Sequence, residues 1–295
     1  MLTRILLVLA TNLAVFGMVA IVLSVLGIVG LAVGPEHLPL LPIAAGCMAW
    51  GVLGACVSLF LYRWIAKRAL NVRLLDGQTG DNDLDWLHAT ASRLSRKAGI
   101  PRPEIGVYES AEVNALTTGR SRRRSLVAVS RGLLHNMSRE EIEGVLGHEV
   151  AHIANGDMVT MALLQGVLNS FVLFFVRLVA LALGRRVSER VSRIATLVIR
   201  IALEFLLGLL GSTIVAWFSR RREFRADAGG SALAGRSAML AALAQLVRTR
   251  DRIDSSWPAL AAFKIAGGGT WFELLASHPP PERRLAALEE AQRSR

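Results

Sequence analysis

Cysteine and acidic residues are scarce in this chain. Cys47 and Cys56 are the only cysteines among 295 residues. Both fall within one apolar run, where a cysteine acts as a small packing residue. Their number and spacing exclude a disulfide framework and a CxxC site, which fits a reducing compartment or one whose redox state is irrelevant.

Acidic residues number 23 against 34 lysines and arginines, which gives a net charge of +11. The basic residues gather at the ends of apolar runs, around Arg63–Arg73 and Arg220–Arg225. This placement is typical of segments next to an anionic cytoplasmic leaflet. Since no zinc finger, basic zipper or aromatic RNA-binding motif accompanies the charge, we expect no nucleic-acid partner.

Long hydrophobic runs dominate the composition, because 53% of the residues are hydrophobic and the mean hydropathy is +0.43. Four runs exceed the ~20 residues that a membrane-spanning helix needs: Ile5–Val33, Leu38–Tyr62, Met158–Leu183 and Ile194–Phe218. They predict two transmembrane hairpins, with the lipid bilayer as a partner; a second hairpin that only dips into the membrane is the alternative. Arg4 before the first hairpin and Arg63–Arg73 after it place both of its ends in the cytoplasm.

Charged residues also occur inside the second predicted hairpin. Arg177, Arg200 and Glu204 lie within its two spans. Because unpaired charges in a bilayer are costly, they form a pair inside the hairpin or extend toward the interface, and the sequence leaves both open. The charges also raise the possibility of transport, which four spans without a repeat support only weakly.

The segment from Ser138 to Met158, SREEIEGVLGHEVAHIANGDM, predicts a helix that carries metal-binding residues. Ser138 and Glu141 have the spacing of a capping box. His148 and His152 are four residues apart, so they project from one face and can hold one zinc ion. Glu149 between them can act as a general base toward a water molecule.

A catalytic zinc needs a third protein ligand. After the fourth run comes REFRADAGG, in which Glu223 and Asp227 are again four residues apart. Glu223 can complete a site of two histidines and one glutamate, and Asp227 can hydrogen-bond a ligand histidine. Alternatively, both carboxylates are surface groups that balance nearby arginines.

HEVAHIANGDM followed by EFRAD across a hydrophobic hairpin resembles the HtpX-type integral-membrane zinc metalloproteases of the gluzincin group. The segments VNALTTG, SLVAVSRGLL and SHPPPERR are similar too, so the resemblance covers nearly the whole chain. It implies an ATP-independent endopeptidase of the bacterial inner membrane that degrades misfolded or damaged membrane proteins. His148, His152 and Glu223 would bind one zinc ion per subunit, with Glu149 as the base. A relation to the CAAX prenyl proteases also makes processing of lipidated peptides a possible variant.

Three short strands are predicted upstream of the helix, at Glu104–Glu109, Val113–Thr117 and Ser125–Ser130, with turn residues Gly119 and Ser121 between the last two. The stretch around Asn114 is a candidate sheet edge that pairs with a substrate backbone. A purely structural strand is equally compatible with the sequence. The basic run at 120–124 predicts a solvated hairpin tip, with contact to anionic headgroups as the alternative.

Two residues near the C-terminus are further candidates. His278 precedes a proline, and in relatives such a histidine lies near the zinc, where it would stabilise the oxyanion or occupy the open coordination position. A structural histidine that caps the loop is the alternative. Arg284 would bind a substrate carbonyl or pair with an acidic neighbour.

We therefore expect an α+β protein with four transmembrane helices in two hairpins and a cytoplasmic, mostly helical zinc protease domain with a small sheet. The predicted boundaries are 1–62 and 158–218 for the hairpins, and 63–157 and 219–295 for the two parts of the protease domain. The competing hypothesis is an inactive scaffold or chaperone-like membrane protein with a structural zinc. The sequence fixes no oligomeric state.

Overall fold

The computed structural model describes residues 40–184, 189–256 and 279–293. The first predicted span, Ile5–Val33, lies outside these residues. The described chain is mostly helical with a small mixed sheet. It divides into two compact units, which are the described parts of Met1–Val57 with Thr160–Ile214, and of Ser58–Val159 with Val215–Arg295.

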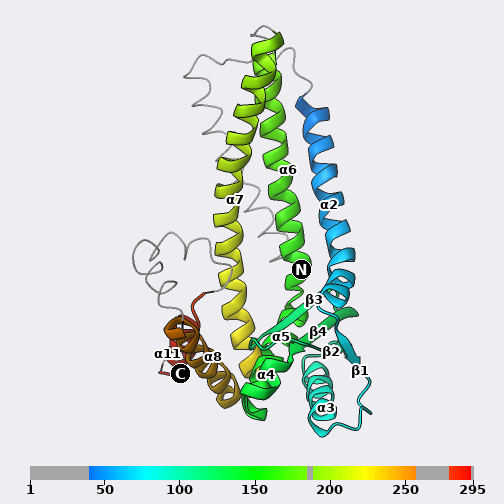
Figure 1. The fold of residues 1–295 in the computed structure, drawn as a ribbon, viewed down its shortest axis with the longest axis vertical. Coiled ribbons are helices and arrows are strands. Elements are labelled where there is room, and N and C mark those ends of the chain that lie inside the picture. Colours follow the sequence, from blue (N-terminus) through cyan, green and yellow to red (C-terminus); the bar gives the residue numbers. More distant parts are fainter. Residues whose placement is uncertain (1–39, 185–188, 257–278, 294–295) are drawn as a thin grey trace. The chain divides into compact units, whose positions relative to one another are not determined.

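Three helices are unusually long: α2 (Leu40–Ala69), α6 (Asp157–Gly184) and α7 (Glu189–Ala234) (Figure 1). Within them, Pro42–Ala69, Asp157–Val179 and Ile201–Ala234 are long and apolar enough to cross a membrane. Side chains such as Trp50 and Phe205 are 67% and 74% exposed. Such exposure of large apolar groups is typical of a surface that faces lipid.

The fourth predicted span ends at Phe218, whereas α7 continues without a break to Ala234. One helix therefore carries both an apolar segment and the charged segment with Glu223 and Asp227. The side chain of Arg200 lies outside the described residues, so the charge pairing within the second hairpin stays a prediction.

The sheet contains β1 (Arg73–Leu75), β2 (Glu104–Tyr108), β3 (Ala115–Ser121) and β4 (Arg124–Ser130), in the order β1-β2-β4-β3. β2 and β4 are parallel, and the other two pairings are antiparallel. The three strands predicted from the sequence are present within a few residues of their expected bounds. β3 is an edge strand, as the sequence predicts for the segment around Asn114.

The turn between β3 and β4 lies within the basic run 120–124, as predicted for the hairpin tip, but not at the predicted turn residues Gly119 and Ser121. Residues 122 and 123 form the turn, while Gly119 and Ser121 lie within β3. Gly119 has a φ of 148° and stands at a register shift in the β3–β4 pairing. A glycine in a strand can mark a bulge as well as a turn, and here it marks the bulge.

Two helices, α3 (Asn82–Lys97) and α5 (Arg139–Asn155), contribute to one core with the sheet. The Asp81 side chain caps α3 by accepting hydrogen bonds from two backbone N–H groups. The predicted capping box of α5 is present, with Ser138 and Glu141 each accepting a hydrogen bond from the other's backbone. The fully buried side chains of this core include Leu87, Leu94, Ile105, Val127 and Leu146.

The remaining elements of this unit are α4 (Arg131–Asn136), α8 (Arg236–Ser256) and α11 (Pro281–Arg293). Met239 and Leu243 of α8 pack with Leu288 of α11. α8 also packs along α5, so α11 is held near the metal-binding helix by way of α8.

Candidate metal centre

The two histidines of α5 lie side by side, as their spacing predicts. The Nε2 atoms of His148 and His152 are 3.0 Å apart, and the rings are nearly perpendicular. Both residues are 8% exposed. Because the chain between them is one helical turn, their relative placement follows from the helix alone.

Glu223 of α7 faces this pair, although it is 71 positions beyond His152 in the sequence. Its Oε2 lies 3.4 Å from His148 Nε2, and its Oε1 lies 3.4 Å from His152 Nε2. The residue is fully buried. One ligand atom from each of the three residues lies within 4.8 Å of the other two. The structure thus joins the three residues proposed as ligands in one cluster.

The Nδ1 atom of each histidine contacts a carboxylate. Asp227 Oδ1 is 2.9 Å from His148 Nδ1, and Asp157 Oδ2 is 2.8 Å from His152 Nδ1. In a neutral histidine that donates its Nδ1–H to a carboxylate, Nε2 carries the lone pair. Two Nε2 lone pairs and a glutamate therefore converge on one point, which fits a divalent metal ion bound by two imidazoles and a carboxylate.

Asp157 is a functional candidate that the sequence reasoning missed. It is the first residue of α6 and directly follows Gly156, which ends α5 in the left-handed conformation with a φ of 69°. This tight turn brings the Asp157 carboxylate back to His152, five residues earlier. The only sequence feature that could have indicated Asp157 was the Gly-Asp pair immediately after the HEVAH helix, and such a pair is typical of an ordinary helix end.

Hydrogen bonding sets the protonation of the metal-free site. Burial lowers the pKa of His152, but its hydrogen bonds to Asp157 and Glu223 outweigh that effect and raise the pKa to about 9. His152 therefore carries a proton at neutral pH when no metal is bound. Since a metal ligand must be a neutral imidazole, metal binding has to displace this proton.

Arg284 of α11 belongs to the same cluster. Its Nε and one terminal nitrogen donate to Asp227, at 2.9 and 2.6 Å, and its other terminal nitrogen lies 3.5 Å from Glu223 Oε2. Burial lowers its pKa, yet the hydrogen bond to Asp227 and that carboxylate's charge raise the pKa above its ordinary value. Arg284 therefore holds Asp227, whereas its predicted contact with substrate stays a prediction.

Close contacts between α5 and α7 explain how Glu223 reaches the histidines. Gly230 lies so near α5 that a Cβ atom there would be 2.9 Å from the backbone nitrogen of His148. A Cβ on Gly147 would likewise be 2.9 Å from the Cβ of Ala234. These small residues let the backbones of α5 and α7 approach each other, and this approach brings Glu223 within reach of the two histidines.

Glu149 lies beside the metal cluster and lines a cavity of about 250 Å³. The same cavity is bordered by His148, Glu223 and Arg284, and by Asn114 and Ala115 at the start of β3. The Glu149 residue is 9% exposed. Asn114 is exposed, and its backbone N–H and C=O are joined to Ser130. His278 lies outside the described residues.

A two-histidine, one-glutamate cluster beside a buried glutamate defines the site of a metallopeptidase, and the three apolar helices make it a membrane protein. The chain belongs to Peptidase family M48, which it matches over residues 82–292.

The relatives support the same assignment. Protease HtpX of Stenotrophomonas maltophilia strain K279a is 48% identical over 295 residues, with 98% of both chains covered. Protease HtpX of Aeromonas hydrophila is 44% identical over 293 residues, with 97% of this chain and 99% of the relative covered.

The crystal structure of S. mikatae Ste24p has the same fold, with a TM-score of 0.57 at 16% identity. The alignment covers 98% of this chain, which spans 66% of the length of that chain. The likeness to Ste24p therefore concerns the fold, and the likeness to Protease HtpX extends along the whole sequence.

Proposed function

We propose that this membrane metalloprotease is a zinc-dependent endopeptidase of the bacterial cytoplasmic membrane that cleaves misfolded or damaged membrane proteins without ATP. The observation that carries the proposal is the convergence of His148, His152 and Glu223 beside Glu149. Two imidazoles and one carboxylate are the ligand set of a catalytic zinc, whereas closed structural sites usually use cysteines.

Each residue of the cluster has a separate task. His148, His152 and Glu223 hold one zinc ion per subunit, which when bound polarises the scissile carbonyl and makes water more acidic. Glu149 takes the proton from the attacking water and passes it to the leaving amine. Asp227 and Asp157 hold the two imidazoles in the tautomer whose Nε2 is available.

Arg284 fixes Asp227 and so acts as a positioning residue. The sequence also predicts that Arg284 contacts a substrate carbonyl. This contact requires a guanidinium N–H that is not occupied by the carboxylates of Asp227 and Glu223. For His278 we keep the proposal that it donates to the carbonyl oxygen of the bound peptide as negative charge develops there.

β3 supplies the surface for substrate. An edge strand has main-chain groups available to pair with an extended peptide, and such pairing accepts many sequences. Asn114, immediately before β3, and Ala115, its first residue, line the same cavity as Glu149. A peptide paired along residues 113–118 would therefore lie next to the base, Glu149. A peptide-bound structure without main-chain contacts to these residues would contradict this part of the proposal.

The proposed topology has four spans in two hairpins, with hairpin boundaries at 1–62 and 158–218. The protease domain is then formed by 63–157 and 219–295 and faces the cytoplasm. The positive charge around Arg63–Arg73 and Arg220–Arg225 supports this orientation, whereas the four arginines of the loop 184–193, on the proposed outer side, oppose it. The compact unit of Ser58–Val159 with Val215–Arg295, which carries all the metal-cluster residues, supports a protease domain that is divided in sequence.

The test compares the wild-type protein with Glu149→Gln, both purified in detergent and stripped with chelator. Zinc is added back with an unfolded membrane protein, and bound zinc and cleavage are measured. Both proteins are expected to bind one zinc ion, while the variant cleaves about 10²–10⁴-fold more slowly because it lacks the base. Glu140→Gln, an exposed glutamate in the first turn of the same helix, is the matched control.

Two results would contradict the proposal. If Glu149→Gln cleaved as fast as the wild type, Glu149 would not be the base. If all three proteins bound zinc and none cleaved any of several unfolded substrates, the scaffold hypothesis would replace the endopeptidase.

A further inference from the structure

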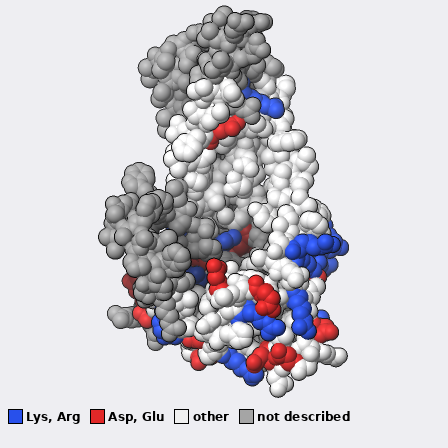
Figure 2. Space-filling model, viewed as in Figure 1, with Lys and Arg blue, Asp and Glu red and all other residues white. Residues whose placement is uncertain are grey.

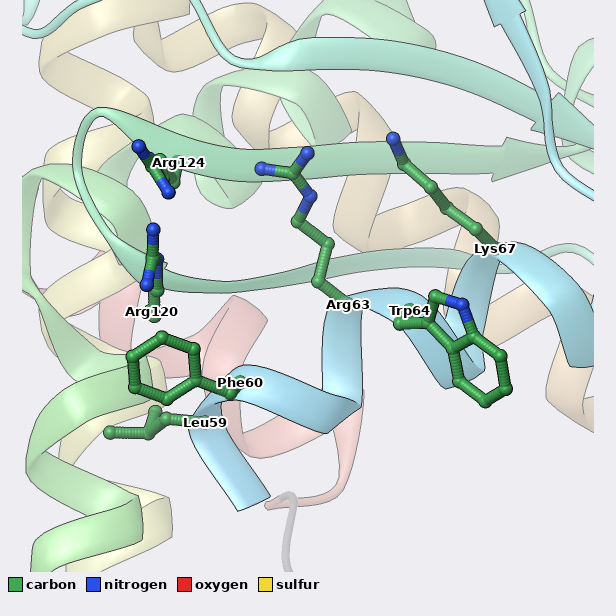
Figure 3. Close-up of a pocket in the computed structure, with 7 residues that line it drawn as sticks. All are labelled: Leu59, Phe60, Arg63, Trp64, Lys67, Arg120 and Arg124. Carbon is green, nitrogen blue, oxygen red and sulfur yellow. The ribbon is translucent and has the colours of Figure 1, made fainter. Parts of the chain in front are cut away.

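A second cavity lies outside the metal centre, at the C-terminal end of α2. It has a volume of about 710 Å³, within the ~300–1,000 Å³ that is usual for small-molecule sites. Figure 3 shows side chains from α2 and from the β3–β4 hairpin around it. The lining residues are Leu59, Phe60, Arg63, Trp64, Lys67, Arg120 and Arg124.

Four of the seven lining residues are basic. Arg63 and Lys67 lie one turn apart on α2, while Arg120 and Arg124 come from β3 and β4. The carboxylate of Glu104 is 3.1 Å from Arg63 and 2.6 Å from Lys67. Glu104 therefore pairs with two of the four cations, Arg63 and Lys67.

Arg120 and Arg124 have no carboxylate within 4.0 Å among the residues that the structure describes. The Arg120 guanidinium instead lies over the ring of Phe60, 4.4 Å from its centre. Figure 3 shows Arg120 and Arg124 on the same side of the cavity, with the Arg63 guanidinium directed toward them. Like charges gathered in this way are stabilised by an anion between them.

The position of the cavity along α2 indicates the source of that anion. The membrane-length segment ends at Ala69, and its last three turns expose Phe60, Tyr62 and Trp64 by 58–63%. Aromatic side chains of this kind form a belt at the level of the lipid headgroups. Figure 2 shows basic side chains gathered at the end of α2, below its uncharged stretch.

We propose that this cavity binds the phosphodiester headgroup of an anionic phospholipid. Guanidinium groups match the geometry of phosphate oxygens, so Arg120, Arg124 and Arg63 donate to the phosphate while Lys67 adds charge. The ring of Trp64 lies beside the glycerol and upper acyl chains. A bound headgroup links α2 to the β3–β4 hairpin and keeps the edge strand β3 at the membrane surface.

The proposal is tested by binding short-chain lipids to the full-length protein in a non-ionic detergent. Dioctanoyl phosphatidylglycerol, dioctanoyl phosphatidylcholine and glycerol 3-phosphate are titrated separately, and the apparent Kd is measured by thermophoresis. We expect the wild type to bind phosphatidylglycerol at least about tenfold more tightly than the other two, because only that probe combines an anionic phosphodiester with acyl chains.

The variant Arg120→Gln/Arg124→Gln is expected to lose this preference. The matched control, Arg96→Gln/Arg102→Gln, removes two exposed positive charges elsewhere in the same unit and should keep it. If the double variant fails to fold, Arg124→Gln alone suffices, because Arg124 is exposed; a loss of about threefold or more is expected from it.

Three results would overturn the proposal. Equal binding of the anionic and zwitterionic lipids would show that charge is not recognised. An equal loss in the control variant would assign the effect to net charge and not to this cavity. Binding of glycerol 3-phosphate as tight as that of phosphatidylglycerol would make the ligand a soluble phosphate.

Discussion

Replacement of Gly230 by alanine tests how the fold places Glu223 opposite the histidines. A Cβ atom at this position would lie 2.9 Å from the His148 backbone nitrogen, 3.0 Å from Met239 Sδ and 3.2 Å from His148 Cα. Met239 can move its flexible end, but the backbone of α5 cannot. The contact falls about 0.5 Å short of ordinary van der Waals separation, so α7 has to move away from α5 by about that amount.

The expected effect on stability is small. Overpacking costs about 1–3 kcal/mol, while alanine improves the helix by about 1 kcal/mol relative to glycine. No comparable gain offsets the effect of the substitution on the metal site. Asp227, one turn before Gly230, moves with α7 and lengthens its 2.9 Å hydrogen bond to His148. Since metal ligands tolerate displacements of only about 0.5 Å, we expect zinc affinity to fall by about tenfold.

Zinc affinity is measured by competition with a chromophoric chelator, and stability by thermal unfolding in detergent. Gly208→Ala is the matched control, because Gly208 lies in the same helix and a Cβ atom there would have no neighbour within 4 Å. Wild-type zinc affinity in Gly230→Ala would refute the reasoning. Equal losses in both variants would refute it too, since only one of them meets α5.

Three further predictions follow from the site and its helix. Asp157→Asn removes the carboxylate that holds His152 and is expected to weaken zinc binding by about 10–100-fold, measured by the same competition assay, with an unchanged affinity contradicting the role of Asp157. In the metal-free protein the pKa of His152 is raised from 6.5 to about 9. The stability that its proton contributes is therefore complete below pH 6.5 and lost as the pH rises through about 9. Over the same range zinc binding should tighten by up to about tenfold per pH unit, and titration calorimetry in two buffers should detect the released proton. Ser138→Ala removes the capping-box hydroxyl and should lower the free energy of unfolding by about 1 kcal/mol in chemical denaturation, with cleavage by the folded enzyme unchanged.

Local patterns were sufficient to predict the elements around the site. The capping box, the helical spacing of His148 and His152 and the three predicted strands depend on residues that are near one another in sequence. Their geometry follows from helix and strand periods, without reference to the rest of the chain.

Tertiary contacts were much harder to predict from the sequence. The approach of α7 to α5 depends on Gly147 and Gly230, whose role appears only when the partner helix is known. Asp157 was missed because a Gly-Asp pair after a helix is an ordinary stop signal, and its return to His152 requires the full turn geometry. Gly119 was misassigned for a related reason, since a turn and a bulge both favour glycine.

The central claim is that His148, His152 and Glu223 bind the catalytic zinc, and the ligand environment of the metal tests it most directly. Zinc K-edge X-ray absorption of the loaded wild-type protein is predicted to show two imidazole ligands, with nitrogen and oxygen donors at about 2.0–2.1 Å and no sulfur. Glu223→Ala should lose one oxygen donor. Sulfur scattering, or a spectrum that Glu223→Ala leaves unchanged, would contradict the account.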